Sequence, residues 1–366
     1  MIDQIKKSGF SINEFSKVTN IAVSRLNELI VGSNEPTMSE VRKIAKALKV
    51  PTDFLVTKPR KYEEISVLFR QGLKTESDKI KADKISYIIG NTFSLLNDYQ
   101  YNSFHEFFPP FENTFTNARI LATKFRQIYY NGDFFIPLLN LPTLVSEELK
   151  CILFIIDLGS GTDGASAIID KIPFIFISPR FQPRMLFTLA HELAHILSHH
   201  NSESNFAKID KEVNGVKRNK YNDEGFANAF ASELLMPEEG VGATLKTIRK
   251  GLGVTGPIGD VELIYLSRIY GVSFDVAAKR CEDLKLLPVG GAISLSDNLK
   301  KLHGSAEKRA KELDIPDRPE VVFPKIPSSL VNSAINKINS GEISIGQVSE
   351  ILSVSISDIM NHNLKG

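Results

Sequence analysis

The chain has 366 residues, which is too long for one ordinary core, so two or three domains are expected. Its 44 lysines and arginines nearly balance its 43 aspartates and glutamates, and its hydrophobic content of 42% is normal for a globular protein. Because the chain as a whole has no strong field, any binding to nucleic acid or to a membrane must come from local patches.

The cysteine count and the apolar runs exclude two further classes of protein. Cys151 and Cys281 lie far apart in apolar contexts and cannot form the disulfide framework of a small secreted domain. The N-terminal stretch has no signal-peptide core, and the longest apolar run, "CILFII", is far below the roughly 20 residues that a membrane helix needs. We therefore expect a cytoplasmic protein with no membrane partner.

Residues 1–60 have the pattern of a helix-turn-helix domain. The segments "SINEFSKVT", "VSRLNELIVG" and "TMSEVRKIAKALKV" are short amphipathic helices joined by short turns. The first 56 residues hold eight lysines and arginines against six aspartates and glutamates, a net charge of only +2. Since phosphate neutralisation supplies most non-specific affinity for DNA, one such unit should bind DNA weakly.

A helical connector and a small sheet are expected next. Residues 61–117 have a helical but irregular pattern to which we assign no function. The runs "CILFIID", "ASAIID" and "IPFIFIS" are short strands, and the tight junction between the last two indicates a hairpin, so a small antiparallel sheet is predicted. If the strand "PFIFIS" lies at a sheet edge, it can pair with an extended peptide.

The segment "RMLFTLAHELAHILSHH" is predicted to form one amphipathic helix, from about Arg184 to His200. His191 and His195 are four residues apart, so they lie on one face of the helix and can direct their imidazoles at one cation. Glu192 points about 100° round the helix from His191, where it can act as a general base beside the metal. This layout is typical of a zinc hydrolase, and Zn²⁺ is the expected cofactor.

A catalytic zinc needs a third protein ligand and an open fourth position. We favour Glu224, because the small residues Ala227, Asn228 and Ala231 share its helix face and let the backbone approach closely. Asp223 is expected to cap the same helix instead. The downstream candidates are Asp210, Glu212, Asp223, Glu224 and Glu233.

A simpler interpretation is available for each of these residues. A single helical histidine is more often a surface or core residue than a ligand, but the full His-Glu-x-x-His pattern arises by chance in only about one such chain in a hundred. His199 and His200 are expected to form a solvated helix end, although both can bind metal. For Glu224 the simpler interpretation is an acidic first turn.

The helix above, followed about thirty residues later by "EGFANAFASELLMP", resembles the ImmA/IrrE family of regulatory metallopeptidases. The resemblance implies zinc ligands His191, His195 and Glu224, with Glu192 as the general base. Members are cytoplasmic proteins of bacteria and their mobile elements that cleave or otherwise inactivate helix-turn-helix repressors. A repressor-type helix-turn-helix protein is therefore the expected substrate.

The N-terminal unit resembles the repressor-type (XRE-like) helix-turn-helix domain that is often fused to these peptidases. It departs from that pattern at Ile12, where such domains usually have a phosphate-contacting glutamine. Its recognition helix offers Ser24, Arg25 and Asn27 as candidate DNA-binding residues, with only one basic side chain among them. Three uses remain open: binding to double-stranded DNA, as a monomer or a homodimer, pairing with a repressor's own helix-turn-helix, or structural dimerisation.

The expected fold class is α+β. It combines the all-α N-terminal domain, a zincin-like metallopeptidase core at residues 118–290, a linker or extension at 291–328, and a helix-turn-helix-like unit at 329–366. The last assignment depends on a weak repeat, since "FSINEFSKVTNIAVS" and "ISIGQVSEILSVSIS" share serines and apolar residues at matched positions. Arg184 and Tyr221 lie close to the motifs, but no residue is identified as the oxyanion stabiliser.

The predicted function is a gene-regulatory zinc metallopeptidase. The rival function is a DNA-binding regulator or antitoxin-like protein in which the metallopeptidase fold serves only as a scaffold or sensor. Glu192 argues against that rival, because a purely structural zinc site needs no general base and usually closes its fourth position.

Overall fold

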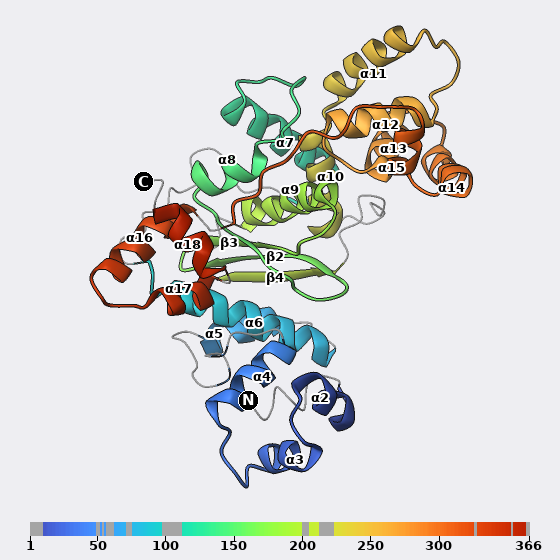
Figure 1. Ribbon diagram of the computed structural model, residues 1–366. Coiled ribbons are helices and arrows are strands. Elements are labelled where there is room, and N and C mark those ends of the chain that lie inside the picture. Colours follow the sequence, from blue (N-terminus) through green and yellow to red (C-terminus); the bar gives the residue numbers. More distant parts are fainter. Residues whose placement is uncertain are drawn as a thin grey trace. The chain divides into compact units, whose positions relative to one another are not determined.

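The computed structural model divides the chain into two compact units (Figure 1). The first comprises Met1–Tyr101, Asn205–Ile209 and Lys325–Gly366, and the second comprises Asn102–Ser204 and Asp210–Pro324. The structure describes residues 10–48, 52, 55, 62–70, 75–96, 112–199, 205–211, 223–325, 328–352 and 354–363.

Three short helices form the N-terminal part of the first unit, as predicted: α2 (Ile12–Thr19), α3 (Val23–Val31) and α4 (Met38–Leu48). Ser11 and Glu14 form a reciprocal capping box at the start of α2. Asn20 ends the helix in the left-handed region with φ 51°, and the Ser16 hydroxyl donates to the Ile21 carbonyl at 2.6 Å across the turn. The turn between α2 and α3 is thus held by side chains as well as by backbone.

The core of this domain contains Phe15, Leu26 and Ile44, each fully buried. Two further helices of the same unit follow, α5 (Tyr62–Arg70) and α6 (Glu76–Thr92). The Arg70 guanidinium pairs with the buried Asp83 carboxylate, which joins α5 to α6.

The C-terminal helices of the first unit are α16 (Ser328–Asn339), α17 (Ile345–Leu352) and α18 (Ile356–Asn363). The Ser349 hydroxyl donates to the Val354 carbonyl at 2.6 Å, the same contact that Ser16 makes between α2 and α3. Ser344 and Gln347 exchange hydrogen bonds at the start of α17 as Ser11 and Glu14 do at the start of α2. The serine repeat therefore extends to matched hydrogen bonds, although a helix-turn-helix role for the C-terminal unit stays a prediction.

The sheet has four strands in the order β1-β3-β2-β4. They are β1 (Ile152–Ile155), β2 (Thr162–Ile169), β3 (Ile172–Ile177) and β4 (Phe206–Lys211). β2 and β3 form the predicted hairpin, and Asp170 and Lys171 turn the chain with φ of 51° and 68°.

Two expectations about this sheet are wrong. It is mixed rather than antiparallel, because β2 lies on the far side of β3 from β1, which leaves β1 and β3 parallel. The strand "PFIFIS" corresponds to β3, which pairs with β1 on one side and β2 on the other. Both sets of its backbone hydrogen-bonding groups are engaged, so β3 cannot take up a peptide as an edge strand.

The second unit places the motif helix α9 (Gln182–His199) over one face of β2 and β3 (Figure 1). Leu186, Leu189, Leu193 and Leu197 are buried along α9 and form its apolar stripe. The helix α10 (Asp223–Leu235) packs against both α9 and α7 (Phe115–Tyr129), while α8 (Leu141–Glu147) precedes β1. The small residues predicted on one face of α10 are buried at this packing.

Five helices complete the second unit. They are α11 (Glu238–Leu252), α12 (Asp260–Ile269), α13 (Phe274–Asp283), α14 (Gly291–His303) and α15 (Ala306–Glu312). The last two fall where a linker or loose extension was expected. Two arginines instead join that segment to α12 and the turn after it. Arg268 donates to the Ile315 carbonyl at 3.0 Å, and Arg318 donates to the carbonyls of Ser267 and Val272. Arg318 thus forms internal contacts, which a solvated linker would not have.

In the part of the chain that the structure describes, no helix has both the length and the apolar character needed to cross a membrane. Cys151 and Cys281 are both free and buried. Burial raises the pKa of both thiols, to about 12 for Cys281.

Candidate metal centre

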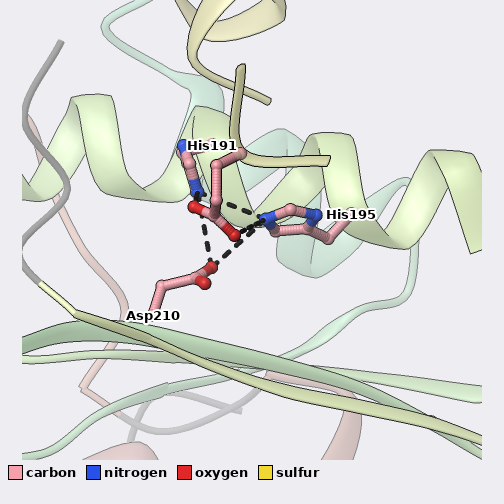
Figure 2. A group of neighbouring side chains, drawn as sticks. His191, His195 and Asp210 are labelled. Carbon is pink, nitrogen blue, oxygen red and sulfur yellow. Dashed lines mark hydrogen bonds and ion pairs between the residues drawn. The ribbon is translucent and has the colours of Figure 1, made fainter. Parts of the chain in front are cut away.

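His191 and His195 lie on one face of α9, and their imidazoles converge as the spacing predicts (Figure 2). Their Nε2 atoms are 3.2 Å apart, and both side chains are buried. On the other side of the His191 ring, Nδ1 donates to Oδ1 of Asn228 in α10 at 3.1 Å. This hydrogen bond fixes the tautomer in which Nε2 carries the lone pair that a metal needs.

Glu224, in the first turn of α10, reaches the same point from the neighbouring helix. Its Oε2 lies 3.3 Å from Nε2 of His191, and its Oε1 lies 3.7 Å from Nε2 of His195. The Glu224 side chain keeps 42% of its surface exposed, whereas the two imidazoles are buried. The three predicted ligands therefore lie together.

Asp210 is a fourth member of the cluster, and sequence reasoning named it only among several candidates. It lies near the end of β4 and points up towards the two imidazoles (Figure 2). Its Oδ2 is 3.3 Å from Nε2 of His191 and 3.2 Å from Nε2 of His195. The residue is only 3% exposed. No local pattern in "FAKIDK" distinguishes this carboxylate from a surface one.

The spacing of these donors is close to what a single metal ion needs. An ion with donors about 2.0–2.2 Å away has neighbouring donors roughly 3.3–3.6 Å apart. The five separations that join the two imidazoles, Asp210 and Glu224 run from 3.2 to 3.7 Å. One donor atom from each of the four residues falls within 4.8 Å of all the others. The cluster can therefore hold a divalent metal ion.

The charges in the cluster also call for a cation. Burial of the His191 imidazole lowers its pKa, but the hydrogen bonds that it donates to the carboxylates of Asp210 and Glu224 outweigh this effect and raise the pKa to about 10. Burial raises the pKa of Asp210, yet His195 and His191 hold that pKa well below its usual range. Without a metal, a protonated imidazole must balance two carboxylates.

Glu192 lies beside this cluster in a recess of the sheet. Both of its oxygens are buried, and among the described residues neither has a hydrogen-bonding partner of good geometry. Burial, followed by the nearby charge of Asp210, raises the pKa of this carboxyl well above its usual value. A Cβ added to Gly164 in β2 would come within 2.3 Å of Glu192 Oε1, so the recess exists because this residue is glycine.

The other residues that the sequence suggested for the site either form contacts with other side chains or lie outside the described residues. Asp223 accepts a hydrogen bond from Asn113, and Glu233 pairs through both oxygens with Arg280. Arg184 pairs with the buried Asp163 at 2.6 Å. Glu212, Tyr221, His200 and the side chain of His199 are outside the part that the structure describes.

The candidate DNA-binding residues of α3 differ in whether their side chains are exposed or already engaged in ion pairs. Ser24 and Asn27 are exposed. The Arg25 guanidinium pairs with Glu40 at 2.7 Å and with Glu28 at 3.0 Å, and these hydrogen bonds raise its pKa. The one basic side chain of α3 is therefore already neutralised within the domain.

Comparison with known families matches two parts of the chain. Residues 147–282 match the peptidase family described as the IrrE N-terminal-like domain, and residues 3–55 match a helix-turn-helix family. No curated protein matches the sequence. The first match contains β1 to β4 and the cluster of His191, His195, Asp210 and Glu224. The chain thus joins an N-terminal helix-turn-helix domain of the repressor (XRE) type to a domain of the IrrE/ImmA-like metallopeptidase family.

Proposed function

We propose that the protein is a zinc-dependent regulatory peptidase that cleaves or inactivates a helix-turn-helix repressor. The observation that carries the proposal is the convergence of two imidazoles and Glu224 beside the buried carboxyl of Glu192, in a domain of the IrrE-like family. Two imidazole nitrogens beside a carboxylate suit zinc better than the harder ions, which prefer oxygen alone.

In this proposal, His191, His195 and Glu224 hold the ion, and Asn228 orients the His191 ring. When bound, zinc supplies Lewis acidity, which polarises a carbonyl and makes a water molecule easier to deprotonate. Glu192 takes a proton from the attacking water and returns it to the leaving amine. Its raised pKa suits a group that must both accept and donate a proton near neutral pH.

The N-terminal domain would bring the peptidase to its target. DNA binding through Ser24 and Asn27 is the first candidate role and would place the enzyme where repressors act. The second candidate is pairing with the helix-turn-helix of the repressor itself, and the engagement of Arg25 by Glu40 and Glu28 favours it. A regulator with either role would work in the cytoplasm.

The test co-expresses a candidate repressor with wild type, Glu192→Gln and Glu224→Ala. We expect wild type to cleave, Glu192→Gln to bind zinc without cleaving, and Glu224→Ala to bind zinc more weakly than wild type. If Glu192→Gln and wild type have the same biological effect, the peptidase function is wrong and the scaffold or sensor function replaces it. Metal analysis of each purified protein separates loss of the ion from loss of the base.

A further inference from the structure

Asp210 has no place among the ligands implied by the family resemblance, yet it contacts both imidazoles as closely as Glu224 does. We propose that Asp210 is a fourth protein ligand of the metal, taking the coordination position that a catalytic centre keeps open, so that the peptidase is held in a self-blocked state. This inference rests on the proposed function.

The geometry supports a closed centre. Catalytic zinc sites have three protein ligands and leave the fourth position to water or substrate, whereas structural sites fill all four. Here His191, His195, Asp210 and Glu224 each bring one donor atom within 4.8 Å of the other three, and all belong to the same compact unit. An ion bound by all four residues would have no coordination position left for water or substrate.

The burial of Asp210 points to the same ligand role. A carboxylate that is 3% exposed needs a hydrogen-bonded cation, because burying a charge without one costs several kcal/mol. Among the described residues, the ion pairs of Asp210 are those that its Oδ2 forms with His191 and His195. Imidazoles that bind a metal are neutral, so the cation that Asp210 then faces is the metal itself.

The neighbourhood of Asp210 distinguishes a blocked enzyme from a purely structural site. Asp210 and Glu192 lie beside the same two imidazoles, because Asp210 contacts both rings and Glu192 directly follows His191 in α9. A structural site has no use for a base, whereas Gly164 leaves room for Glu192 here.

If a bound ion were held by all four residues, opening the centre would require Asp210 to give up its place to a neutral oxygen of water or substrate, leaving His191, His195 and Glu224 to hold the ion. Two carboxylates cancel the charge of a divalent ion, so removal of one leaves the centre with a single positive charge. The opened centre is then the stronger Lewis acid. Anything that draws Asp210 away would activate the peptidase.

The test uses the full-length protein loaded with cobalt, whose visible spectrum reports its ligands. Acetohydroxamate is titrated into wild type, Asp210→Asn and Asp223→Asn, the last making the same charge change at a neighbouring carboxylate. We expect Asp210→Asn to bind acetohydroxamate at least tenfold more tightly than wild type, and Asp223→Asn to behave like wild type. Equal binding by wild type and Asp210→Asn overturns the inference.

A second measurement needs no substitution. Cobalt in the wild-type protein should accelerate the relaxation of water protons no more than cobalt in a fully coordinated chelate. Acceleration typical of an exchangeable water on the ion overturns the inference even if Asp210→Asn does not fold or load.

Assays of repressor cleavage distinguish failure of this inference from failure of the proposed function. We expect Asp210→Asn to cleave faster than wild type, and the double variant with Glu192→Gln to be inactive. If Asp210→Asn gains hydroxamate binding but neither it nor wild type cleaves the repressor, the inference about Asp210 is supported and the proposed peptidase function is wrong. If wild type cleaves and binds hydroxamate as tightly as Asp210→Asn, the function stands and the blocked position fails.

Discussion

Gly164→Ala tests whether the recess in β2 positions Glu192. The new Cβ would lie 2.3 Å from Glu192 Oε1 and 2.8 Å from Thr188 Cγ2, whereas non-bonded carbon contacts are comfortable at roughly 3.5 Å. One or both side chains must therefore move by about 1 Å. Gly164 does not have a left-handed φ, so the effect of alanine is steric and not a backbone strain.

The magnitude follows from that displacement. A shift of about 1 Å in a catalytic group can cost roughly 10²-fold in rate, and overpacking a core typically costs about 1–3 kcal/mol of stability. We expect Gly164→Ala to keep its metal, to unfold at a slightly lower temperature, and to lose about 10²-fold in kcat/KM for repressor cleavage. The assay combines metal analysis, thermal unfolding and cleavage kinetics on the same preparations.

Gly242→Ala is the matched control, because a Cβ at this exposed position of α11 meets nothing within 4 Å. Alanine there should leave cleavage unchanged and stabilise the helix by about 0.5–1 kcal/mol. Full activity in Gly164→Ala, with metal bound, would refute the argument that Glu192 must occupy this recess to act as the base.

Three further predictions concern other parts of the chain. Asn228→Ala removes the hydrogen bond to His191 Nδ1 and should weaken metal affinity about 10–100-fold, measured by chelator competition; unchanged affinity would exclude the orienting role. Glu40→Gln removes one of the two carboxylates that neutralise Arg25, the other being Glu28, and, if the domain binds DNA, should tighten binding and steepen its salt dependence by up to about one phosphate contact; a flat salt titration argues against DNA. Cys151 and Cys281, whose raised pKa keeps them protonated, should resist iodoacetamide at neutral pH until the protein unfolds, and rapid native labelling would contradict their burial.

The features that sequence reasoning placed correctly depend on local geometry. The spacing of His191 and His195 fixes their convergence through the helix period alone. Glu224 followed from the small residues on its helix face, which pack where α10 meets α9. The serine repeat likewise marked turns that share a hydrogen bond, from Ser16 in one and Ser349 in the other.

The features that sequence reasoning did not identify depend on contacts between segments that are far apart in the sequence. Asp210 reaches the imidazoles only because β4 ends beside α9, and Gly164 matters only because Glu192 lies against β2. The mixed sheet arises because β2 crosses to the far side of β3, a choice that strand patterns do not reveal. The engagement of Arg25 by Glu40 likewise depends on how α3 packs against α4.

The most direct test of the central claim is calorimetric titration of zinc into the metal-free wild type and Glu224→Gln. The account predicts a single tight site per chain in wild type and affinity weaker by at least about tenfold in Glu224→Gln. Absence of a tight site in wild type, or an unchanged affinity in Glu224→Gln, would contradict the claim that these side chains share an ion.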